Sequence, residues 1–136
     1  MKVVLDSSVI IAAFATRGLC ADVLEYCLHT ESLFLSEHIL EEVYGNLCKK
    51  IKLPKHKADE ILVFLSSEGK KVKPSPIPHN TCRDKDDLEI LGTAVTAGAD
   101  VIVTGDKDLL ILKNYDFIPI LTPREFWLFV QKKEKH

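Results

Sequence analysis

Short apolar runs alternate with helical stretches along the whole chain, and this alternation is the strongest constraint on its fold. Lys2–Leu5, Ser32–Leu35 and Asp100–Thr104 each contain three consecutive apolar residues, as expected for strands buried on both faces. A weak strand pattern lies at Lys70–Lys73, and Phe117–Leu121 is predicted to be the last strand. Strands that alternate with helices predict an α/β fold of three layers, in which helices cover both faces of a central parallel sheet of about five strands.

Amphipathic stretches and capping residues predict helices between those strands. Ser7 or Ser8 can cap the first helix, and Thr122 followed by Pro123 is typical of a helix start. The predicted helices cover Val9–Phe14, Cys20–His29, the stretch from the cap Ser36 to Lys50, Lys55–Ser67, Asp84–Ala97 and Arg124–Gln131, with a helical turn at Asp106–Leu112. The basic tail Lys132–His136 is expected to fray. No internal repeat or second-domain boundary is visible, so residues 1–136 are expected to form a single domain.

Composition excludes several classes of protein. The formal net charge is −2, so the chain lacks the overall basic character of many nucleic-acid-binding domains, although basic residues can still cluster locally. No apolar run reaches the roughly 20 residues that span a bilayer, and the N-terminus starts as a strand without a signal peptide, so we expect a cytoplasmic protein with no membrane contact.

The cysteines show no zinc-binding spacing and are expected to be buried reduced thiols: Cys20, Cys27, Cys48 and Cys82.

Two aspartates directly follow predicted strands. Asp6 closes the first strand, and Asp106 follows the strand Asp100–Thr104 after Gly105. Ligands of parallel α/β sheets bind beyond the carboxyl ends of the strands, so adjacent strands would bring both side chains into one crevice. The alternative is that each aspartate only caps the helix that follows it. Ser8 could steady Asp6 through a hydrogen bond.

Asp87 lies on the inward face of its predicted helix. At 100° per residue it falls within the buried stripe that Leu91 and Ala94 define, whereas Asp86 is expected to point away. A carboxylate on an inward face must be paired, bound to a metal or neutral. The alternative is a capping box, with Asp84 as the cap and Asp87 three residues later.

The helix predicted after Ser36 carries two adjacent acidic residues. Glu41 and Glu42 flank its apolar stripe on opposite sides, so either could reach a site and either could be solvated. Periodicity does not choose between them.

The loop from Thr104 to Asp108 is the sharpest local motif. Asp106 and Asp108 are spaced so that both can face one ion. Like charges about 4 Å apart repel by roughly 4 kcal/mol at an effective dielectric near 20, so a cluster of four carboxylates normally requires a cation. Oxygen ligands of this kind suit Mg²⁺ or Mn²⁺. Because such sites usually handle phosphate, the carboxylates indicate a metal-dependent nuclease.

A dense basic run surrounds Pro54. It is either a solvated junction between two helices or a contact for the phosphate backbone of RNA. The run contains Lys49, Lys50, Lys52, Lys55, His56 and Lys57. The five histidines show no catalytic arrangement in the sequence.

Four segments together resemble the PIN-domain family, and within it the prokaryotic branch related to VapC ribonucleases. The segments are VVLDSSVIIAAF, SEHILEEVYGNL, RDKDDLEILGTAVTAGADVIVTGDKDLL and FIPILTPREFW, and the resemblance covers nearly the whole chain. It implies a sheet ordered 3-2-1-4-5, divalent-metal binding, and cleavage of single-stranded or structured RNA.

The resemblance also implies roles for individual residues. In this family a Ser is followed six positions later by an acidic residue, which here are Ser36 and Glu42. The patterns Arg-Asp-x-x-Asp and Gly-Asp-x-Asp begin here at Arg83 and Gly105. The implied catalytic and metal-binding residues are Asp6, Glu42, Asp87 and Asp106, with Ser8, Ser36, Arg83, Asp84, Thr104 and Asp108 in supporting roles. The branch often has Thr-Asn where this chain has Ser7-Ser8, and serine is compatible with the role at position 8.

Three functions agree with these expectations. The leading hypothesis is an endoribonuclease dependent on Mg²⁺ or Mn²⁺ that acts as a toxin and is held in check by an antitoxin protein. The second is a ribonuclease of RNA maturation without an antitoxin, and the third is a catalytically silent RNA-binding module, against which the complete set of acidic residues argues. A homodimer is also expected, from the resemblance and from the exposed apolar content of the helices near Val23 and Ile61.

Overall fold

Six strands form one sheet at the centre of the molecule. The structure, a computed structural model, describes residues 1–134. The strands are β1 (Val3–Leu5), β2 (Leu33–Leu35), β3 (Lys70–Lys71), β4 (Val101–Val103), β5 (Asn114–Tyr115) and β6 (Ile118–Leu121), and they lie in the order β3-β2-β1-β4-β6-β5. The first five strands in this order pair in parallel, and β5 pairs antiparallel with β6. The predicted parallel α/β sheet is therefore confirmed.

The edge strand β5 is a correction to the expected order 3-2-1-4-5. The fifth predicted strand is β6, and β5 adds a sixth strand beyond it. A two-residue turn joins β5 to β6, and both of its residues have positive φ, 51° at Asp116 and 64° at Phe117. Such turns usually carry Asn-Gly or Asp-Gly, so the Asp-Phe pair gave no hairpin signal.

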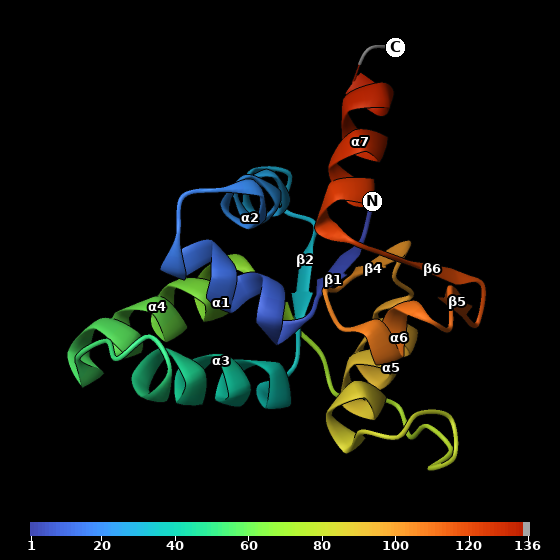
Figure 1. Ribbon diagram of the computed structural model, residues 1–136, viewed down its shortest axis with the longest axis horizontal. Coiled ribbons are helices and arrows are strands. Elements are labelled where there is room, and N and C mark those ends of the chain that lie inside the picture. Colours follow the sequence, from blue (N-terminus) through green and yellow to red (C-terminus); the bar gives the residue numbers. More distant parts are fainter. Residues whose placement is uncertain (135–136) are drawn as a thin grey trace.

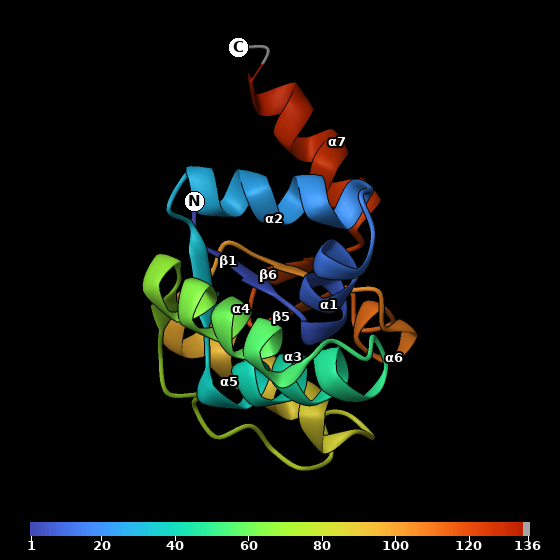
Figure 2. The same cartoon turned by 90° about the vertical axis from the view of Figure 1, so that its left-hand side faces the viewer.

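Helices cover both faces of the sheet and complete the three layers. They are α1 (Ser7–Ala15), α2 (Leu19–His29), α3 (Glu37–Lys49), α4 (Lys55–Glu68), α5 (Lys85–Ala97), α6 (Lys107–Leu110) and α7 (Pro123–Glu134). In Figure 2, α2 lies on one side of the sheet and α3, α4 and α5 lie on the other. The central strands β1, β2 and β4 are buried along their whole length, as their apolar runs predict.

Helix ends follow local sequence in most places. Ser36 caps α3, because its hydroxyl accepts a hydrogen bond from the backbone N–H of Ile39 at 3.3 Å. Gly98 ends α5 with a φ of 62°. The predicted cap at Ser7 or Ser8 is wrong, because α1 begins at Ser7 and Asp6 occupies the cap position, without a capping bond from its side chain.

Two further expectations are corrected. Val23 is fully buried in the core, so it adds nothing to an exposed apolar surface. Lys132 and Lys133 lie in the last turn of α7, so the predicted frayed tail is wrong for residues 132–134, while residues 135–136 lie outside the described part of the chain. The four cysteines are free, and Cys27 is the one that is fully buried.

No single helix within residues 1–134 is long and apolar enough to cross a membrane. The pair α1 and α2 passes that test jointly by length and composition, with a bend of 109° between the two helices.

Candidate active site

A cleft lies at the carboxyl edge of the sheet, where the sequence places its strand-end aspartates. β1 and β4 are neighbours in register, with Leu5 opposite Val103, so the residues that follow them emerge side by side. The cleft has a volume of about 500 Å³. All four predicted carboxylates line it, from the residue after β1, from α3, from α5 and from the loop after β4: Asp6, Glu42, Asp87 and Asp106.

Asp6 is held at the base of this cleft by hydroxyl groups. It is 7% exposed, and its Oδ2 accepts hydrogen bonds from Thr104 Oγ1 at 2.7 Å and Ser8 Oγ at 3.4 Å. Ser7 Oγ lies 3.3 Å from Asp6 Oδ1 and the same distance from Glu42 Oε1, so it links β1 to α3. These bonds fix the orientation of the Asp6 carboxylate before any ligand binds.

Asp87 forms an acidic group with Asp106 and Asp108. One carboxylate oxygen from each of the three residues lies within 4.8 Å of the others. Asp87 is 3% exposed, and its Oδ2 is the one buried side-chain oxygen or nitrogen within residues 1–134 that has no hydrogen-bond partner. Burial first, and then repulsion from Asp106, raise the pKa of Asp87 to about 7. A buried carboxylate oxygen normally has a hydrogen-bond partner or a cation, so this oxygen could hold a cation.

Two aspartates that line the cleft, Asp106 and Asp84, also cap helices. Asp106 Oδ1 accepts from the backbone N–H of Asp108 at 2.9 Å, so Asp106 does cap α6 as the alternative interpretation proposed. Its own N–H donates to Thr104 Oγ1 at 3.0 Å, which couples this loop to Asp6. Asp84 caps α5, with its Oδ1 accepting from Asp86 N at 2.9 Å. The reciprocal bond that would make Asp87 part of a capping box is absent from the described residues.

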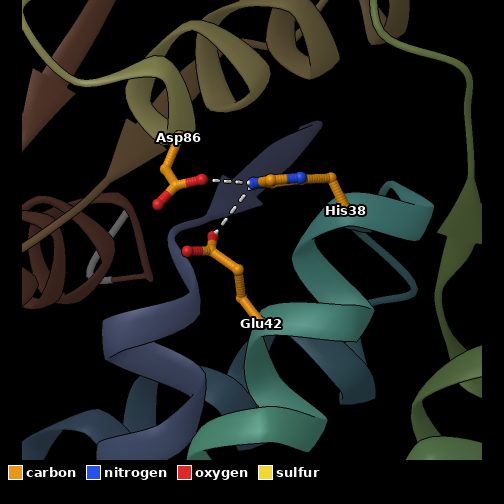
Figure 3. Close-up of side chains that lie close together, drawn as sticks. All are labelled: His38, Glu42 and Asp86. Carbon is orange, nitrogen blue, oxygen red and sulfur yellow. Dashed lines mark hydrogen bonds and ion pairs between the residues drawn. The ribbon is translucent and has the colours of Figure 1, made fainter.

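A second polar group, of which Glu42 and Asp86 line the cleft, contains two residues that sequence reasoning missed, His38 and Asp86. His38 Nε2 lies 2.8 Å from Asp86 Oδ1 and 3.5 Å from Glu42 Oε1, and Figure 3 shows this one end of the ring facing both carboxylates. Asp86 therefore does not point away as predicted, and one histidine does take part in a polar arrangement. His38 and Glu42 are four residues apart on α3, a spacing that places them on one helix face and was the available signal.

Of the two adjacent acidic residues on α3, Glu41 and Glu42, the structure places Glu42 at the cleft. Glu42 lines the cleft, whereas Glu41 is exposed elsewhere on the helix. Burial first, and then repulsion from Asp86, raise the pKa of Glu42 to about 7, while the nearby His38 opposes this shift.

The remaining predicted residues differ in whether they line the cleft. Asp84 lines the cleft, and Ser36 is a buried helix cap. Arg83 is exposed in the turn just before α5. Of the predicted RNA-binding lysines Lys49, Lys50, Lys52, Lys55 and Lys57, all are exposed, and Lys50 also lines the cleft.

The donor set of the cleft fits a hard divalent cation. The four carboxylates offer oxygen ligands only, which Mg²⁺ and Mn²⁺ prefer over softer sites. The unpartnered Oδ2 of Asp87 and the raised pKa values of Asp87 and Glu42 are what an uncompensated carboxylate cluster produces.

Fold and cleft define a class of protein: three-layer α/β domains with a carboxylate-lined cleft at the carboxyl edge of a parallel sheet. The model of the PIN domain matches residues 2–108, so the chain belongs to the PIN-domain family. PIN domains are generally nucleases, and they typically use divalent metals.

Two known proteins are similar to the chain. An uncharacterized protein of Methanocaldococcus jannaschii, MJ1680, is 32% identical over 141 residues, which cover 93% of this chain and 89% of that protein. The crystal structure of VapBC2 from Rickettsia felis bound to a DNA fragment from their promoter has a TM-score of 0.61 and 16% identity, and the match covers 90% of this chain and 98% of that one. At this identity the second similarity concerns the fold alone.

Proposed function

We propose that this protein is a divalent-metal-dependent endoribonuclease that hydrolyses phosphodiester bonds in RNA. The observation that carries the proposal is the buried Oδ2 of Asp87, which has no partner among the described residues and lies in a cleft that Asp6, Glu42 and Asp106 also line. Membership of the PIN-domain family supports the nuclease activity.

The cation would be held by Asp6, Glu42, Asp87 and Asp106, with Asp108 beside them. When bound, a divalent ion would lower the pKa of water and neutralise charge on the phosphate oxygens. No covalent bond between protein and RNA is needed for such a hydrolysis.

The chain's own residues would orient the ligands and hold the substrate. Thr104, Ser7 and Ser8 fix the Asp6 carboxylate through hydroxyl hydrogen bonds. Lys50 stands at the edge of the cleft and would contact an RNA phosphate next to the scissile bond. The neighbouring lysines from Lys49 to Lys57 would extend this contact along the backbone.

RNA cleavage by the purified chain tests the activity. We expect cleavage with Mg²⁺ or Mn²⁺, none with EDTA, and a loss of at least about a hundredfold in Asp6→Asn, because electrostatic groups at such sites contribute on this scale. Asp22→Asn is the matched control, since Asp22 is exposed on α2 and does not line the cleft. Equal cleavage by Asp6→Asn and the wild-type chain would refute the proposal.

We further propose that the protein is a cytoplasmic toxin restrained by an antitoxin protein. The support is the resemblance to the VapC branch and the fold shared with the VapBC2 structure. An antitoxin would place a basic side chain in the cleft, because an Arg guanidinium pairs with two carboxylate oxygens and competes with the cation.

Growth of cells that express the chain alone distinguishes this proposal from a ribonuclease of RNA maturation. A toxin should slow growth, and Asp6→Asn should relieve the effect. Unimpaired growth together with RNA cleavage in vitro would favour the maturation enzyme.

A further inference from the structure

The acidic cleft continues beyond its carboxylates into a part that α1 and the end of α3 line. Its volume of about 500 Å³ lies in the range of pockets that hold a whole small ligand, roughly 300–1,000 Å³. Apart from the carboxylates and serines, much of its lining is apolar: Ile11, Ala12, Ala15 and Ile51. A site for a metal ion and a phosphate group alone has no use for these apolar residues.

Helical spacing explains how the two helices build this part of the cleft. On α1, Ser7, Ile11 and Ala15 recur every four residues and so share one face of the helix. On α3, Glu42 and Asn46 recur in the same way, followed by Lys50 at the helix end. The two helices contact each other, and Figure 1 shows both of them leading away from the sheet.

The character of the lining changes from the sheet outwards. At the inner end, Ser7 Oγ lies 3.3 Å from Glu42 Oε1. Lys50 lies eight residues after Glu42, which is roughly 12 Å further along the helix axis. The lining that α1 and α3 contribute beyond Glu42 contains no acidic residue, and it ends at a lysine. The outer part therefore suits an uncharged, flat group that is attached to a phosphate.

Asn46 supplies a fixed amide group in this outer part. Its Nδ2 donates to the carbonyl oxygen of Glu42 at 2.9 Å, which restrains the side chain. The amide can still offer Oδ1 as an acceptor and its second N–H as a donor. Such an acceptor–donor pair matches the polar edge of a nucleobase, whose ring faces are apolar.

We propose that the outer part of the cleft binds one unpaired nucleobase of the RNA, next to the phosphate at the carboxylates. Ile11 and Ile51, both half-buried, would contact the ring, Asn46 would bind its edge, and Lys50 would contact the neighbouring phosphate. A base enters such a pocket only when it is unstacked and unpaired, so the pocket selects single-stranded RNA. The inference rests on the proposed function, because it takes RNA as the ligand of the cleft.

Binding of single-stranded RNA oligonucleotides, each with one abasic nucleotide at a different position, tests the pocket. The measurements use Asp6→Asn in Mn²⁺, in which cleavage is expected to be slow. At one position, loss of the base should weaken binding by about tenfold, which is the scale of a base contact. Equal binding of all abasic oligonucleotides and the intact RNA would overturn the proposal.

Substitutions in the pocket locate the lost contact. In the same background, Asn46→Ala combined with Ile51→Ala should weaken binding of the intact RNA by about tenfold and abolish the penalty for the abasic nucleotide. The matched control is Gln131→Ala combined with Ile111→Ala, which removes an amide and an isoleucine from exposed positions outside the cleft and should leave the penalty unchanged. An abasic penalty that persists in the Asn46→Ala, Ile51→Ala chain would also overturn the proposal.

The penalty for a missing base separates this inference from the proposed nuclease activity. Misfolding would weaken binding of all oligonucleotides alike, so it does not imitate the loss of a penalty at one position. A chain that shows the penalty and cleaves no RNA would support the base pocket and refute the nuclease. A chain that cleaves RNA and tolerates every abasic position would refute the base pocket alone.

Discussion

At the scale of single residues, Thr104 links Asp6 to the loop that carries Asp106. It is fully buried at the end of β4, its hydroxyl donates to Asp6 at 2.7 Å, and it accepts from the N–H of Asp106 at 3.0 Å. A single hydroxyl thus orients one carboxylate and positions the loop that carries another.

Thr104→Val should keep the shape of this position and remove both hydrogen bonds. We expect metal affinity to fall by about 10–100-fold, as for other residues that orient metal ligands. Calorimetric titration with Mn²⁺ measures the change. Thr96→Val is the control, because Thr96 loses a 2.7 Å hydroxyl contact to Ser75 outside the cleft. Equal affinities in the two variants would contradict the role of Thr104.

The raised pKa values of Asp87 and Glu42 predict how the stability of the metal-free protein depends on pH. The ordinary values are 3.8 and 4.5, and both rise to about 7 in the folded chain, so the folded state binds these protons more tightly than the unfolded state. Proton binding by these two carboxyl groups stabilises the folded state fully below about pH 4, and this stabilisation is lost as the pH rises through about 7.

Urea denaturation in EDTA at pH 5.5 and pH 8 measures this effect. The wild-type chain should be less stable at pH 8 than at pH 5.5, and Asp87→Asn should reduce the difference, because the amide stays neutral at both values. A stability that rises over this range in the wild-type chain but not in Asp87→Asn would reverse the predicted sign.

At the scale of elements, the close crossing of α5 by the loop before it depends on a glycine. A Cβ at Gly92 would lie 2.3 Å from the carbonyl oxygen of Ser75, and Ser75 N–H donates to the Gly92 carbonyl at 3.0 Å. Gly45 on α3 offers a contrast, because a Cβ there meets no atom within 4 Å.

Alanine substitutions at these two glycines should change stability in opposite directions. Gly92→Ala forces the loop away and should cost about 1–3 kcal/mol, as overpacking does. Gly45→Ala should stabilise the chain by up to about 1 kcal/mol, because alanine favours the helix interior. Chemical denaturation of both variants measures the two changes, and a stabilised Gly92→Ala chain would be incompatible with the described crossing.

At the scale of the whole molecule, the carboxylates come from elements far apart in the sequence, so a cation in the cleft would tie them together. Asp6 follows β1, Glu42 lies on α3, Asp87 on α5 and Asp106 before α6. A ligand that binds only the folded state raises stability by an amount set by its concentration relative to its dissociation constant, about 2.7 kcal/mol at a hundredfold excess.

A titration with millimolar Mg²⁺ or Mn²⁺ should therefore raise the melting temperature of the wild-type chain. Asp106→Asn should respond less, and Asp22→Asn should respond like the wild type. A melting temperature that stays constant over the titration would argue strongly against a metal site.

The sequence by itself determined the features that depend on local pattern. Apolar runs that alternate with helices required a parallel sheet, and the parallel sheet placed Asp6 and Asp106 at the same edge. Helical periodicity alone placed Asp87 on a buried face.

Only the tertiary structure decided the features that depend on how elements cross. The choice between Glu41 and Glu42, which the sequence settled by resemblance alone, follows from the approach of α3 to α5, and so does the position of His38 beside Asp86. Strand β5 depends on a turn whose residues adopt positive φ without a glycine. Periodicity indicates which face of an element turns inward, but it does not indicate which residues of two different elements meet. For that reason the contact between His38 and Asp86 could not be predicted.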